Sequence, residues 1–235
     1  MEYKFVTRHE NYEKYASWRV LYSAPWSAPF PVRLIDEIFQ RACELAWKTT
    51  NLKLYDPCLW SGYMMTIIWF LHGSKIQSIT WSDSDEKVLK IAEKNLDLLT
   101  VAWLQKRIAE LESYEKLYGK QSHTDAIKDA QALLSWIHAT NHHINTSCKI
   151  QSIESVEINN QCDIIIADLP YGNLTSWNWE IDIQNAIERL WNNLSQGGIM
   201  VLMSDKKQRF QDFSRQASKK AFNHGKRRIM FVKKM

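Results

Sequence analysis

Apolar residues recur along the chain with two different periods. A spacing of three to four positions, or an apolar run of helical length, predicts helices over residues 32–47, 64–72, 85–99, 101–118, 124–140 and 181–194. Short apolar runs between polar turns predict strands over residues 52–55, 76–81, 148–153, 162–167, 199–203 and 227–232. The run at 162–167, Cys-Asp-Ile-Ile-Ile-Ala, is typical of a strand buried on both faces. This alternation of strands and helices predicts an α/β fold with an open, doubly wound and mostly parallel sheet.

Three stretches interrupt the alternation. Residues 25–31 hold three prolines with aromatic residues between them, so they are expected to be extended rather than helical. Residues 101–143 place two consecutive helices before the third strand and form a helical insertion. A Gln-Gly-Gly turn is predicted at 196–198. At 235 residues, the whole chain 1–235 fits a single domain that carries this insertion.

Charge is distributed unevenly along the chain. The net charge is +4, but residues 205–235 hold eleven lysines and arginines against two aspartates. This basic C-terminal segment therefore carries +9, and residues 1–204 carry −5. Phenylalanines interrupt the basic residues, so the segment is expected to fold. A basic face of this kind fits contact with RNA, and a merely solvated surface is the alternative.

Composition excludes several classes of protein. The chain has 45% hydrophobic and 24% charged residues, as ordinary globular proteins do. The most apolar stretch, 64–71, is too short to cross a bilayer, and the N-terminus is too polar for a signal peptide, so a cytoplasmic protein is expected. Four scattered cysteines without a C-x-x-C pair argue against a zinc ribbon or a disulfide framework. His138 and His142 have helical ligand spacing but no third ligand at a suitable distance, so no metal site is expected.

The residues that follow the strands carry the candidate chemistry. In a parallel, doubly wound sheet, ligands bind outside the carboxyl ends of the strands. Acidic residues occur at four of these ends: Asp56, Asp83, Glu154 and Asp168. Asp85 stands where it would cap the helix over 85–99. The sequence therefore predicts a cluster of carboxylates at one edge of the sheet.

Motifs at these positions resemble a known enzyme family. The Asp-Pro turn with Ser-Gly after the first strand, the acid after the second and Asp-Leu-Pro-Tyr-Gly after the fourth resemble S-adenosylmethionine-dependent methyltransferases of the Rossmann-like class I fold. More narrowly, the chain resembles the AviRa-type, avilamycin-resistance 23S rRNA guanine methyltransferases from about Tyr22 to Ser204. Five blocks in the same order carry this resemblance: 29–34 (PFPVRL), 37–42 (EIFQRA), 56–63 (DPC with SGY), 94–96 (KNL) and 168–172 (DLPYG).

The resemblance implies S-adenosylmethionine as the cofactor and a guanine base of 23S rRNA as the methyl acceptor, with N1 favoured. The turn beneath the methionine part of the cofactor would comprise Asp56, Pro57, Cys58, Ser61 and Gly62. Asp83 would accept hydrogen bonds from the ribose hydroxyls, and Glu154 would lie near the adenine. An ionised carboxylate suits these roles, because it accepts hydrogen bonds and attracts the sulfonium.

The resemblance also implies a catalytic pocket formed by Asp168, Leu169, Pro170 and Tyr171. Asp168 and the backbone carbonyl of Leu169 would accept the N–H protons of an extruded guanine, and Tyr171 would stack on its face. For transfer to N1, Asp168 is the candidate that takes up the proton, directly or through water. Transfer to the exocyclic N2, or to a base of another RNA, is the alternative within this class.

Basic residues are the expected contacts with 23S rRNA or with the large ribosomal subunit. The candidates are Arg33, Lys206, Lys207, Arg209, Lys226, Arg227 and Arg228. Arg33 is a candidate for the cofactor carboxylate or for RNA, and a plain surface position on its helix is the alternative. The insertion is expected to shape the RNA cleft, with its aromatic side chains packed against the domain: Trp103, Tyr114, Tyr118 and Trp136.

One position departs from the family pattern. Trp60 stands where the family has glycine, and glycine there permits a positive φ and lets the backbone approach the cofactor. Either the indole points outward and the turn adapts with weaker affinity, or the indole obstructs the pocket and the chain is a non-catalytic RNA-binding protein. Because Asp83, Glu154 and 168–172 are in place, the sequence favours an active enzyme. The resemblance further implies a role in resistance to orthosomycin-type antibiotics.

Overall fold

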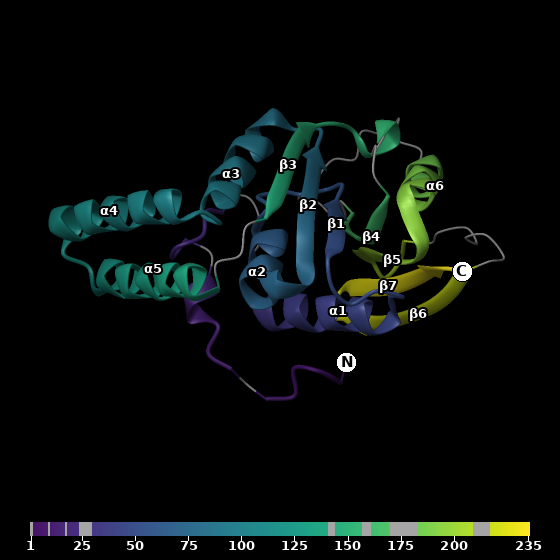
Figure 1. Ribbon diagram of the computed structural model, residues 1–235, viewed down its shortest axis with the longest axis horizontal. Coiled ribbons are helices and arrows are strands. Elements are labelled where there is room, and N and C mark those ends of the chain that lie inside the picture. Colours follow the sequence, from purple (N-terminus) through teal and green to yellow (C-terminus); the bar gives the residue numbers. More distant parts are fainter. Residues whose placement is uncertain are drawn as a thin grey trace.

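The computed structural model describes residues 2–8, 10–16, 18–23, 30–140, 144–156, 161–169, 183–208 and 217–235. The helices are α1 (Val32–Leu45), α2 (Tyr63–His72), α3 (Glu86–Asp97), α4 (Val101–Tyr118), α5 (Gln121–Thr140) and α6 (Ile183–Asn193), with short 3-10 turns at Glu13–Tyr15, Gly73–Lys75 and Ile153–Ser155. The strands are β1 (Leu52–Asp56), β2 (Ile76–Asp83), β3 (Asn145–Ile150), β4 (Cys162–Asp168), β5 (Leu194–Asp205), β6 (Ala217–His224) and β7 (Arg227–Lys234). Figure 1 shows how these helices and strands are arranged.

The seven strands form one sheet in the order β3-β2-β1-β4-β5-β7-β6. β1 to β5 pair with one another in parallel, whereas β7 is antiparallel to both β5 and β6. The predicted doubly wound, mostly parallel sheet is therefore confirmed. The chain reverses its direction of winding between β1 and β4, which is the switch point where open α/β sheets bind their ligands.

The edge strand β6 is absent from the sequence-based prediction. Its residues, ASKKAFNH, include one large apolar side chain, Phe222, whose ring lies 5.8 Å from that of Phe231 on β7. Exposed lysines such as Lys220 are common on edge strands, where they discourage pairing with other chains. β6 and β7 together show that the basic C-terminal segment folds over its described residues.

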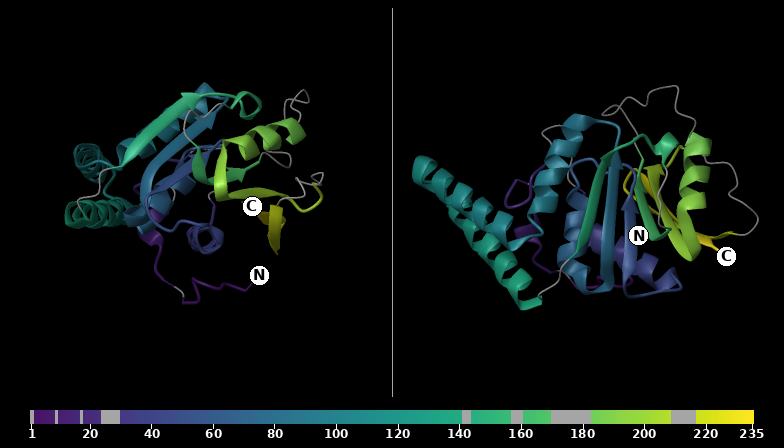
Figure 2. Two further views of the ribbon diagram at one scale, coloured as in Figure 1. Left: turned by 45° about the vertical axis from the view of Figure 1, so that its right-hand side comes forward. Right: turned by 45° about the horizontal axis from the view of Figure 1, so that its top comes forward.

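Side chains alternate between the two faces of the sheet, and helices cover both faces (Figure 2). One face packs against α1, α2 and α3 through residues such as Leu54 and Ile166. The other face packs against α6 and the 3-10 turn after β3 through residues such as Tyr55 and Ile165. Because β4 and the second half of β5 are buried on both sides, their sequences are apolar at nearly every position.

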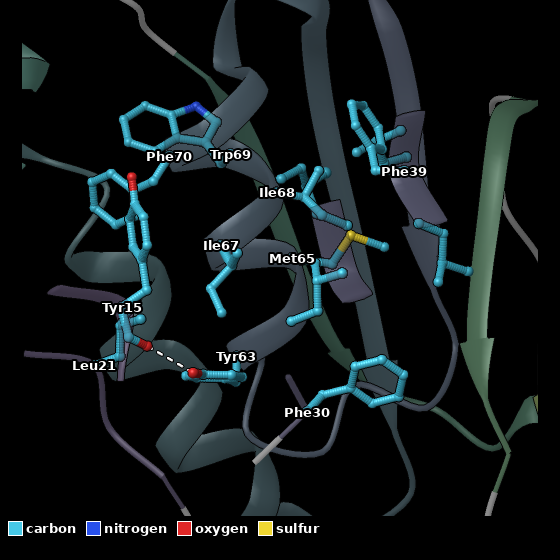
Figure 3. Packing of buried hydrophobic residues seen from close by; sticks show 14 of the residues in the cluster. Tyr15, Leu21, Phe30, Phe39, Tyr63, Met65, Ile67, Ile68, Trp69 and Phe70 are labelled. Atoms are coloured by element: carbon cyan, nitrogen blue, oxygen red, sulfur yellow. Dashed lines mark hydrogen bonds between the residues drawn. The ribbon is translucent and has the colours of Figure 1, made fainter. Parts of the chain in front are cut away.

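The helix α2 is apolar on all sides because other elements enclose it. Met65 and Trp69 are fully buried, and Figure 3 shows the side chains of α2 reaching toward Phe39 of α1 on one side and toward Tyr15 on the other. The Tyr63 hydroxyl donates to the Tyr15 carbonyl at 2.7 Å. α2 has ten residues, and none of the helices described has the length and apolar character needed to span a membrane.

Two elements, β3 and α5, are displaced from the prediction by three residues at a boundary. β3 lies at Asn145–Ile150 rather than at 148–153, because Ile153 is buried in a 3-10 turn instead of in the strand. α5 begins at Gln121, three residues before the predicted start of 124–140. Both differences lie at the ends of elements, where sequence patterns predict boundaries least precisely.

The glycine pair predicted to form a turn at 196–198 lies within β5. Cys162 pairs with Leu194, but Ile164 pairs with Ile199, so β5 contains additional residues between these pairs. The additional residues form a bulge in which Gly197 has a φ of +74°. The prediction of a turn is therefore wrong, because the glycine serves a bulge inside a paired strand.

The insertion is an antiparallel hairpin of α4 and α5 that projects away from the sheet (Figure 1). At its base, the ring of Trp136 packs edge-on against Trp69, at 5.1 Å between ring centres. The expected internal packing is confirmed for Trp136. It is wrong for Trp103, Tyr114 and Tyr118, which are 43%, 36% and 63% exposed; the rings of Tyr114 and Tyr118 contact His123 of α5 within the hairpin.

The N-terminal segment is tied to α1 by a buried carboxylate. Glu37 is fully buried and accepts hydrogen bonds from the backbone N–H groups of Lys4, Phe5 and Val6 at 2.7–3.0 Å. The Nε of Arg41 donates to the same carboxylate at 2.6 Å. Although burial opposes ionisation, these donors hold the pKa of Glu37 below its usual range.

Candidate active site

Three aspartates lie at the carboxyl edge of the sheet. Asp56, Asp83 and Asp168 are the last residues of β1, β2 and β4, which are parallel neighbours. Burial raises the pKa of Asp56 well above its usual value, and the charges of Asp83 and Asp168 raise it further, against one hydrogen bond from the Cys58 backbone. Three of the four acids predicted to cluster therefore lie together at the switch point of the sheet, and we call these three residues the acidic crevice.

The turn after β1 is held in a tight conformation. Asp56 Oδ1 accepts from the backbone N–H of Cys58 at 3.0 Å, and the Gly62 N–H donates to the Leu59 carbonyl at 2.6 Å. Gly62 has a φ of +68°, and a Cβ at this position would lie 2.3 Å from the ring of Trp81. Glycine is therefore required at the start of α2, both for the backbone conformation and for space.

Asp83 faces the same turn. Its Oδ1 accepts from the backbone N–H of Asp85 at 3.1 Å, and its Oδ2 accepts from the backbone N–H of Trp60 at 3.3 Å. Burial raises the pKa of Asp83, although these backbone donors oppose the shift. Asp85 accepts from the Lys87 N–H at 2.8 Å, so its predicted role as the N-cap of α3 is confirmed.

Glu154 lies on the β3 side of the carboxyl edge. It is half-buried in the 3-10 turn Ile153–Ser155, where the Ser152 hydroxyl oxygen accepts from its backbone N–H at 3.3 Å. The backbone N–H of Gln151 donates to the Asp83 carbonyl at 2.9 Å, so the segment that leads to Glu154 is joined to the end of β2. Its role beside an adenine stays a prediction.

Trp60 crosses from the turn after β1 to the end of β4. Its φ is +51°, a region that costs a bulky residue about 1–3 kcal/mol. The position thus adopts the positive φ for which the family's glycine is suited. The half-buried indole donates its N–H to the Asp168 carbonyl at 3.0 Å. The indole therefore points toward β4 rather than outward from the edge, which sequence reasoning had no means of deciding.

β4 leads directly into the predicted catalytic segment. Asp168 pairs with Met203 of β5, and the backbone N–H of Leu169 donates to the Met203 carbonyl at 3.0 Å. The Leu169 side chain is buried, so the backbone is fixed immediately after the strand. Pro170 and Tyr171 lie outside the described residues, and their roles stay predictions.

Five of the predicted RNA-binding residues lie at the same edge of the sheet: Lys206, Lys207, Lys226, Arg227 and Arg228. Lys206 and Lys207 follow β5, and the backbone N–H of Lys206 donates to the Lys226 carbonyl at 3.1 Å. β5 pairs with β4, so Lys206 and Lys207 follow the strand next to the one that ends at Asp168, and β7 is the next strand beyond β5. Lys206, Lys207 and Lys226 are exposed, whereas Arg209 lies outside the described residues.

Arg33 is engaged with the N-terminal segment. Its Nε and Nη2 donate to the Val6 carbonyl at 3.1 and 2.7 Å, and its guanidinium lies over the ring of Tyr3 at 4.0 Å. These contacts give the side chain a structural role, so its contact with RNA or with a cofactor stays a prediction.

Asn95 supports the site, although sequence reasoning assigned it no role beyond the shared KNL block. It is fully buried on α3, and its Nδ2 donates to the Ser61 carbonyl at 2.7 Å and to the Tyr22 carbonyl at 2.9 Å. Its Oδ1 accepts from the Tyr22 backbone N–H at 2.8 Å. A polar residue on the buried face of an amphipathic helix was the signal that could have identified it.

Comparison with known proteins agrees with this geometry. Residues 1–227 match the family described as rRNA methyltransferase AviRa. Over 171 residues, 70% of this chain and 68% of the relative, the chain is 33% identical to a 23S rRNA (guanine(2535)-N(1))-methyltransferase of Streptomyces viridochromogenes.

Solved structures of the same family have a similar fold. The fold is similar to that of rRNA methyltransferase aviRa from Streptomyces viridochromogenes, with a TM-score of 0.88 and 26% identity over 99% of this chain and 96% of the other. A putative methyltransferase, yhhF from Escherichia coli, is similar in fold alone, with a TM-score of 0.55 and 12% identity over 91% and 90% of the two chains. The resemblance found in the sequence is therefore confirmed, and the chain belongs to the AviRa family of rRNA methyltransferases.

Proposed function

We propose that this protein transfers a methyl group from S-adenosylmethionine to N1 of a guanine in 23S rRNA. One observation carries the proposal: the acidic crevice and the exposed lysines at 206, 207 and 226 share one edge of the sheet. Carboxylates suit a cationic donor and the N–H groups of guanine, and lysines suit the RNA backbone. A relative that is 33% identical acts, by its name, on guanine N1 of 23S rRNA.

The described residues fit such a donor electrostatically. S-adenosylmethionine supplies, when bound, a methyl group already activated by positively charged sulfur. The buried carboxylate of Asp56 lies beside those of Asp83 and Asp168, which favours a cation at this edge. In this proposal Asp83 accepts hydrogen bonds from the ribose hydroxyls, Glu154 lies near the adenine, and the turn at 56–62 supports the methionine part.

The same proposal assigns the acceptor to the end of β4. Asp168 and the Leu169 carbonyl accept the N–H protons of the extruded guanine and hold its Watson–Crick edge toward the donor. Transfer of the methyl group to N1 would release the N1 proton, which Asp168 would take up directly or through water. Because the methyl group is already activated, correct positioning of the base supplies much of the catalysis.

The proposed partner is cytoplasmic 23S rRNA, either free or within the large ribosomal subunit. Exposed lysines at 206, 207 and 226 lie where the RNA backbone would run past the extruded base. A methyl group on a guanine that contacts an orthosomycin-type antibiotic would give resistance to that drug.

Methylation of unmodified 23S rRNA by the purified protein tests the proposal. N1-methylguanine blocks reverse transcription because it removes a Watson–Crick donor, so we expect one strong stop and 1-methylguanosine in the nucleoside digest. N2-methylguanosine would instead favour the alternative acceptor. RNA binding without any methylated nucleoside would favour a non-catalytic RNA-binding protein, for which the position of the Trp60 indole is the specific observation.

A further inference from the structure

Trp60 is in contact with two of the three strand ends that form the acidic crevice and follows the third. Its backbone N–H donates to Asp83 Oδ2 at 3.3 Å, and its indole N–H donates to the Asp168 carbonyl at 3.0 Å. It also lies in the turn that begins at Asp56. For both hydrogen bonds to form together, the ring must lie across the interval between the turn after β1 and the end of β4.

The position expected for a ligand at the carboxyl edge of the sheet overlaps that of the Trp60 indole. In open α/β sheets the ligand lies outside the carboxyl ends of the strands at the switch point, which here falls between β1 and β4. This is the interval that the indole crosses. The indole and a ligand that reaches from Asp83 to Asp168 therefore compete for the same space.

The turn itself is closely packed on both sides of Trp60. Leu59 and Ser61 are buried on either side of Trp60, and even a Cβ at Gly62 would lie 2.3 Å from the ring of Trp81. Trp60 is half-buried and so borders solvent, which makes rotation of its side chain the smaller rearrangement. That rotation breaks the bond between the indole and the Asp168 carbonyl.

We infer that Trp60 is a gate: its indole closes the crevice in the absence of the methyl donor and must swing away from Asp168 when the donor binds. The inference rests on the proposed use of S-adenosylmethionine. A ligand that binds only the open state has an apparent affinity lowered by the fraction of closed protein. Replacing the indole therefore raises donor affinity, and the gate sets the donor concentration at which the enzyme works.

Calorimetric titration with S-adenosylmethionine tests the gate in the natural chain and in Trp60→Phe, Trp60→Gly and Trp103→Phe. Trp103 is an exposed tryptophan on α4 and serves as the matched control. We expect about tenfold tighter binding by Trp60→Gly, a smaller gain for Trp60→Phe, which loses only the N–H donor, and no change for Trp103→Phe.

Fluorine NMR of the natural chain labelled with 5-fluorotryptophan follows the ring itself. The Trp60 resonance is the one absent from Trp60→Phe, and it is expected to shift on saturation with the donor, while the Trp103 resonance stays in place. A Trp60 resonance that stays in place at saturation, or variants that bind no tighter than the natural chain, would overturn the gate alone. If none of the proteins bound S-adenosylmethionine, the proposed cofactor and the gate would both be wrong.

Discussion

Two groups of acids, one on α1 and one at the carboxyl edge of the sheet, lie in different surroundings. Asp36 and Glu37 on α1 accept hydrogen bonds from a histidine, an arginine and backbone N–H groups, and the pKa of each is lowered despite burial. Asp56 and Asp83 lie among other carboxylates at the carboxyl edge, and burial raises the pKa of each. The first pair stabilises the native fold. The second pair is maintained at a cost in stability, which is typical of binding and catalytic sites.

The largest effect is expected for Asp168 at the carboxyl edge, whose replacement should lower the rate of methylation but not the affinity for RNA. Asp168→Ala should lower the single-turnover rate of guanine methylation by at least about 100-fold, because the proton acceptor and a base contact are lost. RNA affinity, measured by filter binding, should change little. Asp168→Asn is the matched control, since it keeps a polar side chain of the same size but takes up no proton. An unchanged rate in Asp168→Ala would remove this residue from the mechanism.

Replacing an acid on α1 should instead lower the stability of the protein and leave its affinity for the donor unchanged. Glu37→Ala should lower the free energy of unfolding by about 3 kcal/mol, because three backbone N–H groups and a guanidinium lose their buried acceptor. Urea unfolding measures the loss, and donor affinity should stay unchanged. The lowered pKa means that Glu37 contributes its stability above its unfolded pKa and loses it as the pH falls through the folded value.

A control on the same helix sharpens this prediction. Glu44→Ala replaces an exposed glutamate of α1 and should leave the midpoint of urea unfolding nearly unchanged. A loss in Glu37→Ala as small as in Glu44→Ala would show that the buried carboxylate does not hold the N-terminal segment in place.

The basic residues beside the crevice should affect RNA alone. Replacing Lys206, Lys207 and Lys226 with alanine should weaken RNA binding and make the slope of log affinity against log salt shallower by about 2–3. Calorimetry should show an unchanged affinity for the donor. Lys233→Ala, at the other end of β7, is the control. A salt slope that is the same in the triple variant and in the natural chain would place the RNA elsewhere.

The smallest effect is expected on the free energy of unfolding when the charge of Asp56 is removed from the acidic crevice. Asp56→Asn should stabilise the protein by about 1 kcal/mol at pH 7, because the amide still accepts from the Cys58 N–H but carries no charge. Because the pKa of Asp56 is raised, the native carboxyl takes up its proton as the pH falls, and the gain should fade in acid. Thermal unfolding at several pH values measures both effects.

The matched variant on α1 should behave in the opposite way. Asp36→Asn removes a carboxylate whose pKa is lowered by the His72 contact, so it should lose stability at pH 7. If Asp36→Asn and Asp56→Asn changed stability in the same direction, the distinction between the two regions would not hold.

Much of the fold follows from local patterns, and the exceptions have physical causes. The strand at 162–167 is identifiable because burial on both faces makes its sequence apolar throughout. β6 is not identifiable, because an edge strand tolerates lysines on a polar face. The glycines at 197 and 198 signal a break in regular structure, but only the pairing with β4 distinguishes a bulge from a turn.

Some features of the candidate site are likewise predictable from the sequence, and others are not. The meeting of Asp56, Asp83 and Asp168 is predictable, because parallel neighbouring strands end at one edge. The direction of the Trp60 indole is not predictable, because it depends on a carbonyl 108 residues away. The contacts of Arg33 likewise depend on where the N-terminal segment returns to α1, which no local pattern encodes.

Calorimetric titration of the natural chain and of Asp83→Ala with S-adenosylmethionine tests most directly whether the acidic crevice holds the methyl donor. We expect micromolar binding by the natural chain, about −8 kcal/mol. Asp83→Ala should bind at least about tenfold more weakly, with a free energy of unfolding no lower than that of the natural chain. Equal affinities in two equally stable proteins would contradict the account, because they would place the donor away from the carboxyl edge.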